Sequence, residues 1–323
     1  MAIKLKELAG QPERLASGHR FCSGCAEPII MRQILHAIEQ PVVVSMATGC
    51  AEIATTMYPT TAYHVPWIHS AFENAATTIS GAEAMYRSLV RQGKIPDRDI
   101  RFIAFGGDGA TYDIGLQFLS GALERGHRFI YVCLNNEAYM NTGIQRSSAT
   151  PMGAHTTTSP AGDVIPGKVQ WRKPLTDIIA AHRIPYVAQA APSRWRDLMT
   201  KAQKAADADG PSFINVFSDC NRGWRHATDT TIDVTALAVD TCYWPLFEVE
   251  EGVWRLNYKP REKKPVVEWL KTQGRFRHLF HQLPPPHLLY SEGSQSGAQR
   301  LLTWFRGIAV HFTPDCGKPC EGR

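Results

Sequence analysis

Phe102 to Pro151 reads FIAFGGDGATYDIGLQFLSGALERGHRFIYVCLNNEAYMNTGIQRSSATP, and this stretch decides the fold. The apolar run 102–105 predicts a strand that breaks at Gly106-Gly107-Asp108-Gly109. Small residues there let the backbone approach a phosphate closely, and the next segment supplies a helix N-terminus with free N–H groups. A second apolar run, 129–134, predicts another strand that ends at Asn135-Asn136-Glu137.

Asp108 and Asn136 are expected at the same edge of a parallel sheet. Each follows a predicted strand, and open α/β sheets bind ligands at the carboxyl ends of their strands. A carboxylate, an amide oxygen, a backbone carbonyl and diphosphate oxygens form an all-oxygen shell suited to Mg²⁺. The GGDG sequence alone is equally consistent with an ordinary strand-to-helix turn, because short glycine motifs are weak signals.

The remaining chain alternates predicted strands and helices. Strands are predicted at 42–46, 186–190 and 212–217, and helices at 28–40, 70–91, 175–184 and 195–208. This alternation predicts an α/β fold with a mostly parallel sheet and helices on both faces. We expect a loop over a cleft at 58–69 and a lid or subunit contact at 146–170. A helix at 228–243 and a hairpin of 244–249 with 253–258 follow.

Composition limits the possible functions. The 323 residues include 44% hydrophobic residues, enough for a sizeable core, and carry a net charge of +5. The Lys and Arg are scattered, so no nucleic-acid partner is expected. The N-terminus lacks the apolar core of a signal peptide, and no run approaches the roughly 18 apolar residues that cross a bilayer. We therefore expect a cytoplasmic protein without membrane contact, whose eight cysteines are not a disulfide framework.

Cys22 and Cys25 form a C-x-x-C pair that has three interpretations. A thioredoxin-like redox pair requires a preceding strand and a cis-proline partner. A zinc knuckle requires a second pair at short spacing, and Cys316 and Cys320 lie almost three hundred residues away. An iron–sulfur cluster requires four thiolates that need not be close in sequence. Cys133 and Cys242 are most simply small buried hydrophobic residues.

Several segments together resemble one family. GDG, the continuation NEAYMNTGIQRSSATP, and the cysteine contexts GHRFCSGC, ATGC and SDC are similar to the thiamine diphosphate-binding β subunit of pyruvate:ferredoxin oxidoreductase and its wider 2-oxoacid:ferredoxin oxidoreductase family. The resemblance implies a thiamine diphosphate-binding fold. It implies a cofactor domain at 1–225 and a C-terminal extension at 226–282 with subunit contacts. For residues 283–323, where the resemblance fades, we expect an irregular tail of unknown role.

The resemblance also implies the site residues. Asp108 and Asn136 would ligate Mg²⁺ together with the Ala138 carbonyl, and Asn141 would be the catalytic residue beside the reactive end of the cofactor. The other residues implied to bind the cofactor are Thr48, Gly49, Gly107, Gly109, Ala110 and Thr142. The four cysteines implied to hold one [4Fe–4S] cluster are Cys22, Cys25, Cys50 and Cys220.

By the same resemblance, the chain is an enzyme subunit that oxidatively decarboxylates a 2-oxoacid, with pyruvate as the leading substrate. The products would be CO₂ and an acyl group on coenzyme A, with electrons passed to ferredoxin or flavodoxin. Because the chain carries only the diphosphate motif, we expect a separate α subunit to supply the Glu that activates the cofactor. The run C-x2-C-x2-C-x3-C-P is absent, so further clusters would lie on γ/δ-type subunits.

Alternatives remain at this level. The substrate could be a branched-chain 2-oxoacid, 2-oxoglutarate or oxalate. A non-redox thiamine decarboxylase would not need four ligating cysteines, and an electron-transfer subunit with a vestigial thiamine site would not need the complete Asp108, Asn136 and Asn141 set. His64 and His69 are either proton donors near the substrate or structural histidines of an aromatic loop.

Overall fold

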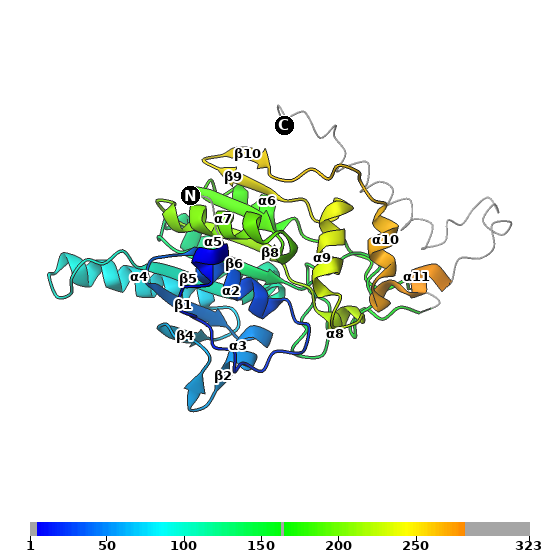
Figure 1. Ribbon diagram of the computed structural model, residues 1–323, viewed down its shortest axis with the longest axis horizontal. Helices are drawn as coiled ribbons and strands as arrows, with labels where there is room; N and C mark the ends of the chain where they lie inside the picture. The colour runs from blue at the N-terminus through cyan, green and yellow to red at the C-terminus, as the bar shows by residue number, and fades with distance from the viewer. Residues whose placement is uncertain (1–4, 163–164, 282–323) are drawn as a thin grey trace.

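The computed structural model describes residues 5–162 and 165–281, and an eight-stranded sheet of order β10-β9-β7-β8-β6-β5-β1-β4 runs through it (Figure 1). Six strands are parallel: β1 (Val42–Ala47), β4 (Trp67–Ser70), β5 (Arg101–Gly107), β6 (Ile130–Asn135), β7 (Tyr186–Ala190) and β8 (Ser212–Phe217). The hairpin of β9 (Phe247–Glu250) and β10 (Val253–Leu256) extends one edge in the antiparallel sense. The prediction of a mostly parallel α/β sheet is confirmed.

Helices cover both faces of the sheet, because its central strands are apolar on both sides. In β5, Ile103 and Phe105 join one core and Phe102 and Ala104 join the other. The main helices that contribute to the first core are α2 (Glu27–Ala37) and α7 (Trp195–Asp207). Those that contribute to the second are α4 (Ala75–Arg91), α5 (Leu116–Glu124) and α6 (Leu175–Ala180).

Two local expectations are corrected. The segment 58–69 is not only a loop, since it contains β3 (Thr60–Thr61), which pairs with β2 (Thr56–Met57), and most of β4. The sequence did not reveal β4 because it is an edge strand whose middle residues, Ile68 and His69, are exposed, so the apolar pattern of a buried strand is missing. After Asp108 the chain first forms a π-helical turn, η1 (Gly109–Ile114), and only then α5.

A third core lies in the C-terminal part of the described chain. Its short elements are α8 (Asn221–Trp224), α9 (Thr231–Asp240), α10 (Val266–Lys271), η3 (Gly274–Phe276) and α11 (His278–His281). Large aromatic side chains fill it, namely Phe217, Trp224, Tyr243, Trp244, Trp269 and Phe276. Tyr243 and Trp269 stack with ring centroids 3.9 Å apart. The predicted tail 283–323, with Cys316 and Cys320, lies outside the described residues.

The sheet brings four strand ends together. The strands β8, β6, β5 and β1 are neighbours and parallel, so their carboxyl ends share one edge. The chain continues from these ends into the segments that carry Cys220, Asn136, Asp108 and Thr48 respectively. The remaining short helices are α1 (Leu5–Leu8), α3 (Cys50–Thr55) and η2 (Pro192–Arg194). None of the helices described is long and apolar enough to cross a membrane.

Candidate active site

A cleft of about 130 Å³ opens at the shared edge of these strands. Most residues that the sequence assigned to the cofactor line it: Thr48, Gly49, Cys50, Gly107, Asp108, Gly109, Asn136, Ala138, Asn141 and Thr142. Ala110 does not line the cleft, because it lies in the first turn of η1 and is buried in the core. The cleft therefore brings together residues from three segments of the chain, 48–50, 107–109 and 136–142.

Asp108 is a buried carboxyl group with one unpaired oxygen. Only 1% of the residue is exposed, and Oδ2 accepts a short hydrogen bond from the Ser147 hydroxyl. Oδ1 has no hydrogen-bond partner among the described residues. Burial raises the pKa of Asp108 to about 8, and within the described part of the chain no cation contacts the carboxyl group to oppose this effect.

Asn136 presents a second unpaired oxygen. Its Nδ2 donates to Glu27 Oε1 at 3.1 Å, which leaves the amide Oδ1 buried and without a partner in the described chain. Trp224 Nε1 donates to the Asn136 carbonyl at 2.8 Å and fixes the backbone. Unpaired buried oxygens are costly, and two of them at one cleft are the kind of ligand that a hard cation prefers.

Gly107 and Gly109, which flank Asp108, have different surroundings. A side chain added at Gly109 would lie 2.3 Å from the Tyr139 ring, so the residue is needed for packing. An atom added at Gly107 would meet nothing within 4 Å, since Gly107 lines the open cleft. The open space above the Gly107 backbone fits a diphosphate, which requires close approach to the main chain.

Glu27 is a residue of the cleft that the sequence did not assign. It is 3% exposed, and its Oε2 has no partner in the described part of the chain. Burial raises the pKa of Glu27 to about 7, although the hydrogen bond from Asn136 opposes the shift. An acid in the first turn of a helix is ordinarily explained by the helix dipole, so its position two residues after Cys25 was the only sequence signal.

The four predicted cluster cysteines lie in one region of the molecule. All are free thiols, and Cys50 is within electrostatic range of Cys22, Cys25 and Cys220. Backbone N–H groups point at two of the sulfurs, since Gly223 N lies 3.4 Å from Cys220 Sγ and Glu27 contributes a backbone hydrogen bond to Cys25. Hydrogen bonds to sulfur are a feature of iron–sulfur sites.

The same cysteines do not form a site for a single metal ion. Within residues 5–162 and 165–281, no three His, Cys, Asp or Glu side chains are close enough to hold one ion. A four-iron cluster is larger than one ion, so its ligands stand farther apart. Burial raises the pKa values of the Cys25, Cys50 and Cys220 thiols, that of Cys220 to about 12, and a bound metal centre would reverse this.

The glycine of the C-x-x-C turn is required by its packing. Gly24 has φ +78°, and a side chain there would lie 2.2 Å from the Thr228 carbonyl oxygen. The Thr231 hydroxyl donates to the Gly24 carbonyl, and Ala26 N donates to the Asp219 carbonyl at 3.4 Å. These contacts hold the Cys22–Cys25 turn beside the segment that carries Cys220.

His64 and His69 differ in their contact with the cleft. His69 Nε2 lies 2.7 Å from the hydroxyl of Thr48, a cleft residue, so His69 reaches the site through Thr48. His64 Nδ1 lies 3.0 Å from the carbonyl of Glu13, and His64 does not line the cleft. The structural interpretation therefore fits His64 better than His69.

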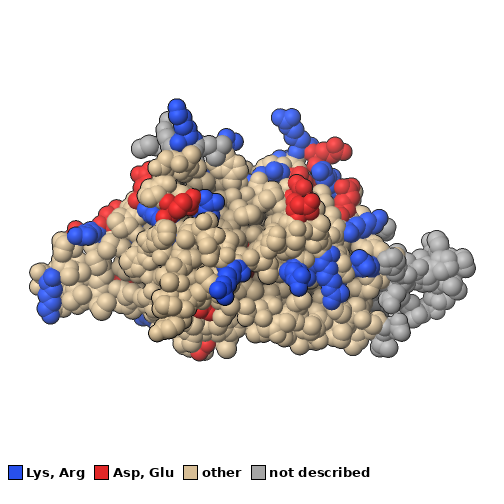
Figure 2. All heavy atoms as spheres, turned by 60° about the horizontal axis from the view of Figure 1, so that its bottom comes forward, with Lys and Arg blue, Asp and Glu red and all other residues tan. Residues whose placement is uncertain are grey.

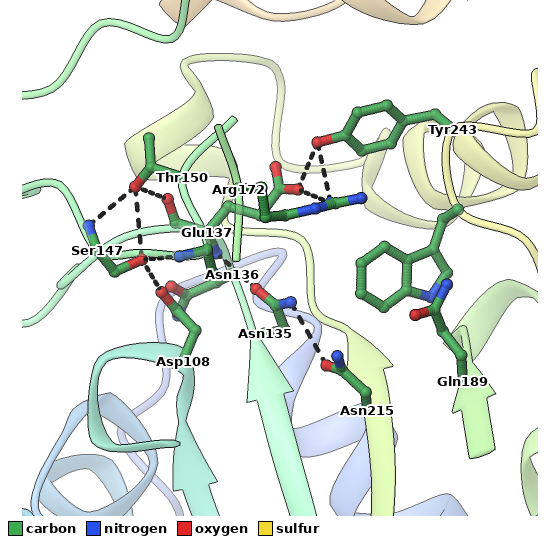
Figure 3. A network of polar contacts seen from close by, with 12 residues as sticks. Asp108, Asn135, Asn136, Glu137, Ser147, Thr150, Arg172, Gln189, Asn215 and Tyr243 are labelled. Carbon is green, nitrogen blue, oxygen red and sulfur yellow. Dashed lines mark hydrogen bonds and ion pairs between the residues drawn. The ribbon is translucent and has the colours of Figure 1, made fainter. Parts of the chain in front are cut away.

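Glu137, between two cleft residues, has the opposite environment to Asp108. It is fully buried, and Arg172, Tyr243 and Arg275 all donate to its carboxylate. Figure 3 shows this carboxylate facing Arg172 and Tyr243, while Asp108 faces Ser147. Glu137 is therefore a structural carboxylate, whereas Asp108 and Asn136 are available to a ligand.

Comparison with known proteins agrees with this geometry. The profile of the family "Thiamine pyrophosphate enzyme, C-terminal TPP binding domain" matches residues 47–216. Pyruvate synthase subunit PorB of Thermotoga maritima is 52% identical over 289 residues, covering 87% of this chain and 89% of the relative. PorB of Methanocaldococcus jannaschii is 52% identical over 268 residues, covering 83% and 90%. Ketoisovalerate oxidoreductase subunit VorB of Pyrococcus abyssi is 43% identical over 269 residues, covering 83% and 86%.

A solved structure shares the fold. It is a 2-oxoglutarate:ferredoxin oxidoreductase from Magnetococcus marinus, with a TM-score of 0.53 and 18% identity over 72% of this chain and 80% of that chain. The identity and coverage of the PorB relatives confirm the family resemblance inferred from the motifs. The chain belongs to the thiamine-dependent β subunits of the 2-oxoacid:ferredoxin oxidoreductase family.

Proposed function

We propose that this β subunit acts in the CoA-acylating oxidative decarboxylation of pyruvate, with Mg²⁺–thiamine diphosphate in the cleft and one [4Fe–4S] cluster beside it. The observation that carries the proposal is the pair of buried, unpaired oxygens, Asp108 Oδ1 and Asn136 Oδ1, at the sheet edge where the segments with Cys50 and Cys220 also begin. Pyruvate is proposed because PorB relatives reach 52% identity.

The residues have separate roles in this proposal. Asp108, Asn136 and the Ala138 carbonyl would ligate Mg²⁺, and the open backbone at Gly107 would face the diphosphate. Thiamine diphosphate, when bound, supplies the electron sink for decarboxylation. Asn141 would orient the reacting end, and its side chain also hydrogen-bonds Cys50. The contact between Asn141 and Cys50 supports a short path for electrons from the cofactor to the cluster.

Cys22, Cys25, Cys50 and Cys220 would hold the cluster. The backbone N–H groups at Cys25 and Cys220 would then lower the energy of the thiolates. Ferredoxin or flavodoxin would accept the electrons, and coenzyme A the acyl group.

A partner subunit would complete the site on a largely uncharged face. Figure 2 looks toward the side on which β2 and β3 lie in Figure 1, and most of that face carries neither acids nor bases. Tyr58, in the turn between β2 and β3, is 98% exposed, and Ile53 and Ile68 are 54% and 38% exposed. An α subunit that covers these apolar residues would bring its Glu to the cofactor.

The test is the cofactor content of anaerobically purified protein that is co-expressed with its partner subunits. We expect about four iron and four sulfide per chain, with thiamine diphosphate and magnesium. A Cys50→Ser variant should lose iron, whereas a Cys133→Ala control should keep it, because Cys133 lies in the core of β6. Zinc in place of iron would refute the redox role.

Ketoisovalerate is the second candidate substrate, because a VorB subunit is 43% identical. Initial rates with pyruvate and with ketoisovalerate, measured as CoA-dependent reduction of ferredoxin, decide between them. A higher kcat/KM for ketoisovalerate would replace pyruvate in the proposal and leave the cofactor chemistry unchanged.

A further inference from the structure

Glu137 stands between the two residues proposed to ligate Mg²⁺, Asn136 and Ala138, with an unusual backbone. Its φ is +66°, a left-handed conformation that non-glycine residues seldom adopt and that surrounding contacts must hold. The conformation of Glu137 sets where the Asn136 side chain and the Ala138 carbonyl point. The residues that contact the Glu137 side chain therefore also position the loop 136–138, which carries two of the proposed metal ligands.

Two of the groups that hold Glu137 come from the C-terminal segment. Arg275 Nη2 donates to Oε2 at 2.6 Å, and the Tyr243 hydroxyl donates to Oε1 at 2.6 Å. Arg172 Nη1 donates to Oε1 at 3.0 Å from the segment before α6. The Glu137 N–H itself donates to Asn135 Oδ1 at 3.1 Å.

Several contacts fix the position of the buried Arg275 side chain. It is 2% exposed, its Nε donates to Gln273 Oε1 at 2.8 Å, and its guanidinium lies 4.0 Å from the centre of the Trp224 ring. Trp224 in turn donates to the Asn136 carbonyl. Arg275 thus acts on the loop in two ways: directly at Glu137, and through Trp224 at Asn136.

The backbone of Arg275 adds a third connection. Its carbonyl accepts the His155 N–H at 2.9 Å, which ties the C-terminal segment to the segment 146–170, predicted to be a lid or a subunit contact. Ser147, at the start of that segment, donates to Asp108. The short helix η3 is therefore connected both to the 136–138 loop and, through the segment 146–170, to Asp108.

We propose that Arg275 is a positioning residue for the cofactor: from the C-terminal segment it holds the 136–138 loop in the conformation that binds the Mg²⁺–diphosphate. The inference rests on the proposed function and assigns the segment 226–281 a role in cofactor binding. A planar guanidinium is needed, because only it can stack on Trp224 while it donates to Glu137 and Gln273 in different directions.

The test uses the full chain in its complex, stripped of cofactor, and isothermal titration with Mg²⁺ and thiamine diphosphate well below the unfolding temperature. Arg275→Met should raise the Kd for Mg²⁺ about 10–100-fold, as is usual when a residue supporting a metal ligand is lost. Arg275→Lys should not restore it. The matched control is Arg277→Met, two residues on and exposed, which should bind as the wild type does.

A double variant separates positioning from stability. Glu137→Gln with Arg275→Met leaves no buried Arg275 cation without its anion, so the unfolding temperature should recover relative to the Glu137→Gln single variant. Binding of Mg²⁺ should remain weak, because no other residue replaces Arg275 in positioning the 136–138 loop. A wild-type Kd in either Arg275→Met or the double variant overturns the inference. A wild-type complex that does not bind Mg²⁺–thiamine diphosphate overturns the proposed function instead.

Discussion

Asp108 and Glu137 are two buried carboxyl groups at adjacent strand ends, and their surroundings are opposite. Glu137 is paired with Arg275 and Arg172, whereas Asp108 contacts no cation among the described residues and its Oδ1 is unpaired there. A buried charge without a partner costs several kcal/mol. The difference separates a carboxylate that stabilises the fold from one that is kept available for a ligand.

The same difference appears in the groups around each carboxyl. Tyr243 completes the pairing of Glu137, while the Asp108 region adds Glu27 and Asn136, each with a further unpaired oxygen. Thirteen other buried polar side-chain atoms in the described chain also lack a partner, but these three oxygens line one cleft together. Substitutions at the two places should therefore have different effects on the stability of the metal-free chain.

The largest effect is expected from Asp108→Asn. Loss of this carboxylate should lower activity of the complex by at least about 100-fold, more than the loss of a supporting residue, because a direct metal ligand is removed. The metal-free chain should be no less stable, since an uncompensated buried acid is gone. Activity and the thermal midpoint without cofactor measure the two effects, with exposed Asp229→Asn as the control.

In the wild type, Mg²⁺ and thiamine diphosphate at 100 times their Kd should stabilise the chain by about 2.7 kcal/mol. The Asp108→Asn chain should show no such gain. Full cofactor-dependent stabilisation of the variant would mean that Asp108 is not a ligand.

Glu137→Gln should show the reverse pattern in the metal-free chain. The substitution leaves Arg275 buried without its anion, which costs about 3–5 kcal/mol of stability. Denaturant unfolding of the variant measures this loss directly. A variant as stable as wild type would show that the Arg275 pair is not a structural ion pair, and the comparison with Asp108 would fail.

The smallest effect concerns Lys168, a cation buried near the same loop. Its Nζ donates to the carbonyls of Thr150 and Ser147, and burial lowers its pKa to about 8. An unfolded lysine titrates near 10.4, so between these values the unfolded chain binds more protons and the contribution of Lys168 to stability rises with pH. The thermal midpoint of the wild type minus that of the Lys168→Met variant should therefore increase from pH 8 to pH 10. A difference independent of pH would contradict this.

Much of the site could be predicted from local sequence. The runs 102–105 and 129–134 are long enough and apolar enough to be strands, and residues that follow parallel strands lie at one edge. Asp108, Asn136 and Ala138 therefore line one cleft as expected. Ala110 does not, because the π-helical first turn of η1 buries it, and no residue pattern distinguishes that turn from an ordinary helix start.

The supporting residues could not be predicted in this way. Ser147, Glu27 and Arg275 are ordinary polar residues in sequence, and each acquires its role only by contact with a residue far along the chain. Arg275 is 138 positions from Glu137, and Glu27 is 109 positions from Asn136. Edge strand β4 was missed for a related reason, since its pairing with β1 defines it more than its own composition does.

The sequence by itself determined the α/β alternation, the family and the residues at the ends of the strands, because apolar periodicity and short motifs are local properties. The tertiary structure alone decided which buried carboxyl groups are paired. Pairing depends on distances between side chains that the chain brings together only when it folds. For that reason Asp108 and Glu137, which look alike as acids after a strand, serve as a proposed metal ligand and as a structural anion.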